Sequence, residues 1–494
     1  MDIPILSSLI LLPTIGAIFI FFSKSNVEKY NSSKYIALFI STANFILSLY
    51  LWFVFDNSIS EFQFVENRKW IAGLVNYKVG IDGISILFII LTTFITPLCV
   101  ISVNTTVKKR LKDFLISILL LETLMIGVFC SLDLVIFYLF FEAGLIPMFL
   151  IIGIWGGPKR VYSAFKFFLY TLLGSVLMLV AIISIYWISG TTDVIKLYEL
   201  GIDAKYQNLL WLAFFSSFAV KTPMWPVHTW LPDAHVEAPT AGSILLAGVL
   251  LKVGAYGILR VSIPFFTEGF LEYKFLIAVL SVIGIIYGAI VAIAQIDIKR
   301  LIAYSSVSHM GFVMLGISAG NYLSLEGAII QMVNHGLTTG ALFMLVGFLY
   351  ERRHTRRISD FGGIKATMPK YAAIFLFCSF ASIGLPGLNG FVGEFMILMG
   401  SFATYKVLSG IGAFGVVLAA IYMLWAYQRM FTGEISIQEN KELVDLDSKE
   451  MISVVPLLVL MLFIGIYPSF IEGYVTQDAL LISEIIDIFS GRLN

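Results

Sequence analysis

Six titratable side chains lie inside long apolar stretches of this 494-residue sequence. They are Glu142, Lys221, Lys252, His309, His335 and Glu394. A charged side chain at the centre of a bilayer costs about 2.5–3.5 kcal/mol on insertion scales, so a membrane chain retains one only where it has a partner or a function. Each therefore has two interpretations, a functional group or a satisfied structural residue inside a helix bundle. Glu122, in another apolar stretch, is a further candidate with the same two interpretations.

The chemistry that these residue types share is proton transfer. Burial lowers the pKa of a lysine and raises that of a glutamate, whereas pairing the two does the reverse. A Lys–Glu pair whose separation changes can therefore take up and release a proton near neutral pH, and a histidine needs little shift to do so. Because such groups titrate as a coupled set, no single pKa would belong to any one of these residues.

The elements that must position these groups are membrane-spanning helices. Hydrophobic residues make up 59% of the sequence and charged residues 13%, whereas soluble domains carry about 25% charged residues. Apolar stretches of roughly twenty residues recur along the chain, long enough for helices to cross the bilayer core. We therefore predict an all-α polytopic membrane protein. The 32 basic and 32 acidic residues balance, which argues against a nucleic-acid partner.

About fourteen spans are predicted from these stretches. They lie near 3–22, 34–55, 83–105, 113–131, 133–154, 163–188, 207–228, 240–260, 274–294, 299–318, 324–350, 371–404, 407–430 and 453–471. The expected organisation is an N-terminal three-helix segment (1–112), a first five-helix repeat (113–262), a second, inverted repeat (274–430), and an acidic loop with the last helix and a tail (431–494).

Two of the titratable groups lie beside predicted helix breaks, in the seventh and twelfth spans. Lys221 is followed by Pro223 and Pro226, which remove helical hydrogen bonds, and Glu394 follows a segment rich in glycine that contains Pro386. Irregular backbone at membrane depth is tolerated only where it lines a cavity or is buried in protein. Interrupted helices in corresponding halves of a chain are also typical of inverted-repeat transporters.

The placement of Lys and Arg predicts the orientation. Basic residues gather in alternate loops, on the side opposite to the termini, and the largest group is Arg352, Arg353, Arg356, Arg357, Lys365 and Lys370. This side is expected to face the cytoplasm or matrix. The same group has a second interpretation as a patch that binds lipid or a partner. The acidic stretch 434–450 is expected to be a solvated loop or a contact with a neighbouring subunit.

No cofactor site is predicted on this chain. Cys99, Cys130 and Cys378 lie far apart and form no CxxC pair, so we expect neither an iron–sulfur cluster nor a zinc site. No GxGxxG segment follows a predicted strand, so a nicotinamide or flavin site is not expected either.

One segment is specific enough to indicate a family. The sequence KTPMWPVHTWLPDAHVEAPTAGS begins at Lys221, and LLKVGAYG follows it around Lys252. These segments resemble the corresponding sequences of the antiporter-like subunits of respiratory complex I (NADH:quinone oxidoreductase) and of multisubunit Na+/H+ antiporters. The resemblance covers almost the whole chain. The segments VGIDGIS at 79–85 and GFVGEF at 390–395 share it. Glu394 distinguishes one branch of the family within complex I, because the sister subunits usually carry lysine there.

The resemblance implies a proton-translocating subunit in the membrane arm of an enzyme complex. Glu142 would tune Lys221, the central carrier, and Lys252 would relay the proton toward the second half. His309 and His335 would continue the axis, and Glu394 would connect it to the outside.

The family also implies the partners and the location. NADH, FMN, the iron–sulfur clusters and quinone would lie on partner subunits, and other antiporter-like chains would be neighbours in the membrane arm. The location would be a bacterial inner membrane or, alternatively, the mitochondrial inner membrane.

Other functions stay open. One is a subunit of a multisubunit Na+/H+ antiporter, and another is a structural membrane anchor with no transport role. A carrier for an organic solute has no support, because no substrate-recognition pattern accompanies the titratable groups.

Overall fold

The computed structural model describes residues 4–23, 32–71, 75–103, 107, 109–435 and 437–493. Twelve helical segments of this part of the chain are long and apolar enough to cross a membrane. Ten are single helices: α1 (Ile5–Phe22), α2 (Ser32–Val54), α3 (Gly83–Ser102), α4 (Leu111–Cys130), α7 (Arg160–Ser189), α14 (Thr267–Ile293), α15 (Ile298–Ala319), α16 (Tyr322–Arg353), α19 (Lys406–Phe431) and α20 (Ser448–Ile466). The polytopic helical fold is confirmed; the predicted start of the first span, residue 3, lies outside the described residues.

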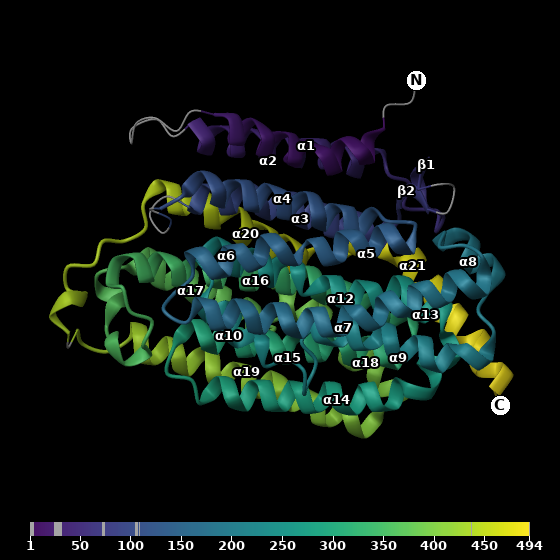
Figure 1. Ribbon diagram of the computed structural model, residues 1–494. Helices are drawn as coiled ribbons and strands as arrows, with labels where there is room; N and C mark the ends of the chain where they lie inside the picture. The colour runs from purple at the N-terminus through teal and green to yellow at the C-terminus, as the bar shows by residue number, and fades with distance from the viewer. Residues whose placement is uncertain are drawn as a thin grey trace.

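The helices run side by side along the long direction of the molecule (Figure 1). The pair α1 and α2 lies along one edge, α14 and α19 lie along the opposite edge, and α16 passes through the middle. The most buried spans are α15, α16 and the segment Thr240–Phe265, whose apolar windows are 94%, 100% and 100% buried. These three central spans carry His309, His335 and Lys252, so the titratable groups lie in the protein interior and not against lipid.

Both predicted helix breaks are confirmed. Helix α9 (Ala204–Lys221) ends at the lysine and not at the predicted residue 228, because Pro223 cannot donate the next helical hydrogen bond. A turn leads from it to α10 (Trp230–Glu237). The twelfth span consists of α17 (Pro369–Ile383) and α18 (Asn389–Thr404), with Pro386 and Gly387 between them.

Two further spans are irregular, which we did not predict. The fifth changes from α5 (Leu134–Ala143) to α6 (Leu145–Trp155) at Gly144. The eighth contains two π-helical turns, η1 (Leu246–Leu250) and η2 (Ile258–Ser262), between α11 (Thr240–Leu245), α12 (Lys252–Gly257) and α13 (Ile263–Phe265). Such turns are frequent at functional sites, and here they flank the segment that begins with Lys252.

One end of the bundle carries structure outside the membrane spans. Strands β1 (Gln63–Ile71) and β2 (Val75–Ile81) pair antiparallel there, with Arg68 opposite Tyr77, and the short helix α8 (Val194–Leu200) lies nearby (Figure 1). Helix α1 begins and α21 (Ser469–Leu493) ends at this same end. The last span ends at Ile466 and not at the predicted 471, because Pro468 separates α20 from α21.

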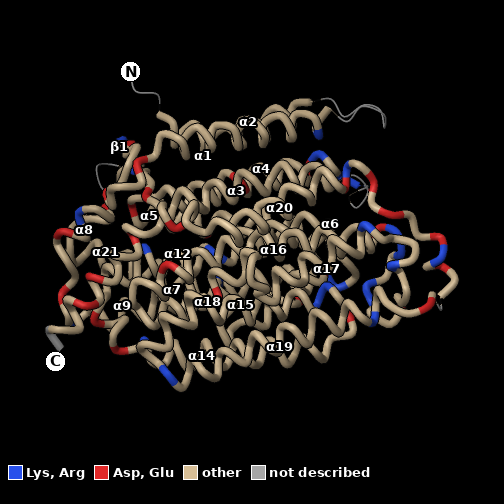
Figure 2. The backbone as a smooth tube through the Cα atoms, turned by 180° about the vertical axis from the view of Figure 1, so that it is seen from behind, with Lys and Arg blue, Asp and Glu red and all other residues tan. Residues whose placement is uncertain are grey.

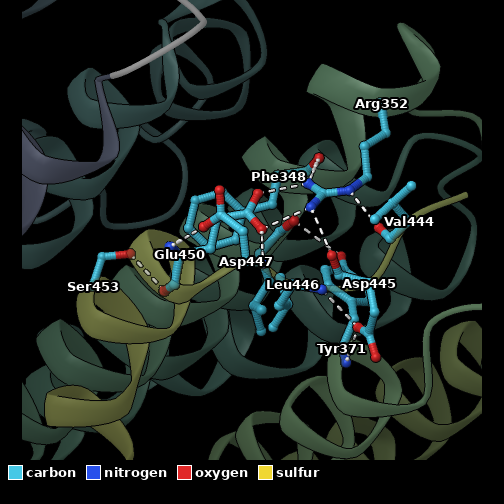
Figure 3. Close-up of polar contacts among 10 residues, drawn as sticks. Phe348, Arg352, Tyr371, Val444, Asp445, Leu446, Asp447, Glu450 and Ser453 are labelled. Carbon is cyan, nitrogen blue, oxygen red and sulfur yellow. Dashed lines mark hydrogen bonds and ion pairs between the residues drawn. The ribbon is translucent and has the colours of Figure 1, made fainter.

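The opposite end of the bundle carries the main gathering of Lys and Arg (Figure 2). There the acidic stretch 434–450 is tied to the basic cluster rather than free in solvent. Arg352 donates two hydrogen bonds to the Glu450 carboxylate, at 2.6 and 2.7 Å, and one to the carbonyl of Val444 at 2.8 Å (Figure 3). Asp445 accepts from the amides of Lys370 and Tyr371 in the first turn of α17. This loop therefore holds the ends of α16, α17 and α20 together.

We expect Arg352→Ala to destabilise this end of the bundle. It removes charge-assisted hydrogen bonds, each worth about 1.5–3 kcal/mol, at a pair whose side chains are only 18% and 12% exposed. The temperature at which the chain is lost from its purified complex should fall. The matched control is Arg357→Ala, which removes the same charge from an exposed position in the same cluster. Equal thermal stability of the two variants would contradict the role given to Arg352.

Candidate functional site

The centre of the candidate site is a contact between Lys252 and His335. The Lys252 ammonium lies 2.7 Å from Nδ1 of His335 and also donates to the Ala247 carbonyl in the preceding π-helical turn. Lys252 is 0% exposed and His335 is 3% exposed. When the lysine is charged, Nδ1 must accept, so the imidazole is then neutral and carries its proton on Nε2. Two charged groups at this distance would repel each other, so the pair holds one excess proton at a time.

A second contact joins His309 to Glu394. Nδ1 of His309 lies 2.9 Å from Oε1 of Glu394, and its Nε2 lies 3.3 Å from the Ser382 hydroxyl. Gln331 donates to the same carboxylate oxygen at 3.1 Å. The His309 ring lies 5.8 Å from the His335 ring, between centroids, which places the two contacts next to each other. Four of the predicted residues thus form one buried line from Lys252 through His335 and His309 to Glu394.

The sequence interpretation missed the neutral polar residues around this line. Gln331 lies four residues before His335 on α16, and this spacing puts both side chains on one face of the helix. The spacing was therefore the sequence signal from which Gln331 could have been predicted as a neighbour of the histidine. Gln331 lines a small cavity together with His309 and His335. The other polar residues that line this cavity are Asn334, Thr338, Thr339 and Ser382.

The start of α18 is fixed by a separate set of polar contacts. The side chain of Asn334 donates to the Asn389 carbonyl at 2.6 Å, and the Asn389 side chain donates to the Thr338 hydroxyl at 3.3 Å. These bonds join α16 to the first residue of α18. They also hold Glu394, one turn further along α18, toward α15 and α16.

Glu142 and Lys221 are neighbours but form no direct ion pair in the described part of the chain. Each acts on the other electrostatically. The Lys221 ammonium lies 4.7 Å from the centroid of the Phe141 ring and has no hydrogen-bond partner among the described residues, although it is only 1% exposed. The two side chains are therefore near each other without a direct ion pair, and Phe141 lies beside the lysine.

Close packing brings the first break against the span that carries Lys252. A Cβ atom on Gly254 would lie 2.2 Å from the Thr222 hydroxyl and 2.6 Å from the Phe218 carbonyl, so only glycine permits this approach. No hydrogen bond between described residues joins Lys221 directly to Lys252. The axis thus has two parts, Glu142 with Lys221 and the line from Lys252 to Glu394, in contact through backbone packing.

Glu122 does not join either part. Its Oε1 accepts from the Asn44 side chain at 3.0 Å between α4 and α2, and it is 1% exposed. His235, in α10 after the first break, stacks on Phe343 with ring centroids 4.5 Å apart and interacts electrostatically with Lys252. His235 therefore lies nearer to the line of contacts than Glu122 does.

No group of three or more His, Cys, Asp and Glu residues that could hold a metal ion occurs in the described ranges. The three cysteines are buried and free.

Comparison with known proteins places this arrangement in a family. Residues 131–421 match the model of the family described as NADH:quinone oxidoreductase/Mrp antiporter, TM. This range covers more than half of the chain and contains all six residues of the two-part axis. The chain belongs to the NADH:quinone oxidoreductase/Mrp antiporter family. The resemblance drawn from the segment after Lys221 is therefore confirmed.

Relatives in this family match over nearly the full length. NADH-quinone oxidoreductase subunit M of Rhodobacter capsulatus is 51% identical, over 90% of this chain and 89% of its own. NADH-ubiquinone oxidoreductase chain 4 of Marchantia polymorpha is 46% identical, over 94% of each chain.

Solved structures show the same fold. A chain of respiratory complex I from Thermus thermophilus superimposes with a TM-score of 0.89 at 30% identity, over 97% of this chain and 99% of that one. A chain of an archaeal membrane-bound sulfane sulfur reductase has a TM-score of 0.86 at 22% identity and covers 96% of this chain; it shows the fold alone.

Glu394→Gln tests whether ionisation of the side chain at position 394 is needed for proton pumping. Glutamine keeps the size and an acceptor for His309 but cannot exchange a proton, so we expect the complex to assemble and to pump fewer protons per electron. Glu394→Lys restores a titratable group and should retain more pumping than Glu394→Gln. Pumping by membrane vesicles, measured with a pH-sensitive dye, distinguishes the variants. Equal pumping by Glu394→Gln and the wild type would show that the carboxylate is only structural.

Proposed function

We propose that this chain is a proton-translocating subunit of the membrane arm of an NADH:quinone oxidoreductase, of the type called subunit M or chain 4. The observation that carries the proposal is the buried line of contacts from Lys252 through His335 and His309 to Glu394. The two outer pairs of this line are hydrogen-bonded, and the two histidine rings between them lie 5.8 Å apart, so a proton would cross one gap in a line through the most buried part of a membrane bundle. A structural anchor would need no such continuity, because single buried polar residues can be satisfied locally.

In this proposal Glu142 and Lys221 form the loading part of the axis. A shorter distance between the two side chains favours the charged lysine, and a longer distance favours release of its proton. The ammonium beside Phe141 is held without a hydrogen bond, so a small movement of α5 at its break near Gly144 would change its electrostatic environment. A proton released from Lys221 would pass to Lys252, and the charge there would displace the proton shared with His335 toward Glu394.

The driving reaction would occur on other subunits. We propose that NADH, FMN, the iron–sulfur clusters and quinone bind to partner chains, and that this chain couples to them through the membrane arm and its other antiporter-like subunits. The basic end of the bundle would face the cytoplasm or matrix, and the end with β1, β2 and α21 would face outward. The chain would reside in a bacterial inner membrane or, alternatively, a mitochondrial inner membrane.

Lys221→Ala is the direct test of this function. A positioned proton-transfer group contributes roughly 10²–10⁴-fold to a rate, so coupled quinone reduction should fall at least about tenfold, while electron transfer to a soluble acceptor and assembly persist. The matched control is Lys205→Ala, an exposed lysine at the start of the same helix that pairs with Asp203 at 3.3 Å. A normal ratio of protons to electrons in Lys221→Ala membranes would leave the anchor interpretation standing.

The family description also names Mrp antiporters, so Na+/H+ exchange is the second candidate. Membranes that contain the chain should show no Na+-driven proton movement in the absence of NADH. Na+-dependent exchange that disappears in Lys221→Ala would favour the antiporter.

A further inference from the structure

A second group of buried charges lies outside the axis, at the end of the bundle that holds β1, β2 and α21. Asp82 caps α3, Arg260 lies in η2, and Asp478 lies in α21. They are 1%, 6% and 3% exposed, respectively. Asp82 lies in the VGIDGIS segment, and the line from Lys252 to Glu394 includes none of the three residues. We call them the outer triad.

Close backbone contact holds the outer triad together. A Cβ atom on Gly83 would lie 1.7 Å from the Tyr474 carbonyl and 2.9 Å from a carboxylate oxygen of Asp478, so α21 rests directly on the first residue of α3. Oδ2 of Asp478 accepts from the Ile84 amide at 3.0 Å, and Asp82 accepts from the Ser85 amide at 2.8 Å. Two carboxylates from distant parts of the chain thus meet at one helix N-terminus.

The charges of the outer triad do not balance when both aspartates are ionised. Arg260 forms an ion pair with Asp82 and interacts electrostatically with Asp478, so one guanidinium faces two carboxylates. Oδ1 of Asp478 is buried and has no hydrogen-bond partner among the described residues. An unpaired buried carboxylate oxygen is unfavourable, whereas a proton on it removes the excess charge.

The surroundings of Asp478 favour that proton. Burial raises its pKa above the usual range, although Arg260 and the amides of Gly83 and Ile84 act in the opposite direction. The other titratable groups that interact with Asp478 are the hydroxyls of Tyr198 and Tyr256. A phenol is neutral at physiological pH and negative when it loses its proton, and burial raises the pKa of Tyr198 further. None of them supplies the second positive charge.

Tyr256 lies between Lys252 and the outer triad along one span. It follows Lys252 by four residues within α12, a spacing that places both on one side of the helix, about 6 Å apart along its axis, and Arg260 follows in the π-helical turn η2. The Tyr256 hydroxyl lies 2.9 Å from the Ser85 hydroxyl and donates to the Phe129 carbonyl at 3.0 Å. Ser85 in turn belongs to the N-terminal turn of α3 that Asp82 caps.

We propose that the outer triad is a proton-binding site, with Asp478 as its acceptor, and that it provides a second exit for a proton held by Lys252. The proton passes along the Tyr256 and Ser85 hydroxyls to Oδ1 of Asp478 and leaves to the outer aqueous phase. This inference rests on the proposed proton-translocating function. It adds an exit at the outer triad to the one at Glu394.

Asp478→Asn in the intact complex separates this role from a structural one. The amide oxygen can still accept from Ile84, and Arg260 keeps Asp82, so a purely structural triad would be unaffected. A proton-binding site would be lost, and the number of protons pumped per electron should fall below the wild-type value. Electron transfer to a soluble acceptor should not change. Asp478→Glu retains a titratable carboxyl and should restore the ratio.

Tyr256→Phe tests the connection independently. It removes one hydroxyl and keeps the ring, and it should lower the ratio as Asp478→Asn does. The matched control for Asp478→Asn is Glu326→Gln. It neutralises another carboxylate beside α21, one that accepts a hydrogen bond from the Thr476 hydroxyl at 2.8 Å. A wild-type ratio in both Asp478→Asn and Tyr256→Phe overturns the second exit. If Lys221→Ala lowers pumping in the same series, the proposed function stands without it; if Lys221→Ala has no effect, the proposed function itself fails.

Discussion

The high free energy of an ionisable side chain in hydrocarbon is the constraint on which this bundle depends. Lys252 is fully buried, and the interior supplies it with a carbonyl from a π-helical turn and an imidazole nitrogen. An ordinary α-helical turn offers few free carbonyls, because each one accepts a hydrogen bond from within the helix. The irregular backbone near Lys252 therefore provides a polar group for the lysine at membrane depth, whereas the side chains of His309 and Gln331 provide the partners of Glu394.

The same irregular segments allow the two parts of the axis to affect each other. The turn after Lys221 packs through Thr222 on Gly254, two residues after Lys252, without a hydrogen bond between the lysines of the described structure. A charge on one lysine raises the energy of a charge on the other in a medium of low dielectric constant. Movement of a proton along the line toward Glu394 would lower that repulsion. Electrostatics can therefore couple the two parts although no direct hydrogen bond joins the lysines.

Much of this arrangement was predictable, because the residues that break helices are visible in the sequence. Pro223 and Pro386 predict the breaks beside Lys221 and Glu394. The break at Gly144 also had a signal in Pro147, which lies in the first turn of α6, where a helix tolerates proline. The π-helical turns have no such marker. The spacing of Gln331 from His335 indicated its side of α16, but its contact with Glu394, and the approach of Asp478 to Arg260 and Asp82 across distant parts of the chain, depend on tertiary packing and could not be predicted from local pattern.

The contact between Lys252 and His335 is the centre of the account, since it joins the first half of the chain to the line that ends at Glu394. His335→Gln tests it most directly, because glutamine can still accept a hydrogen bond from the lysine but cannot carry a proton. The measurement is the number of protons pumped per electron by membranes that contain the assembled complex. The account predicts a lower ratio with electron transfer to a soluble acceptor unchanged. An unaltered ratio would contradict a proton path through this pair.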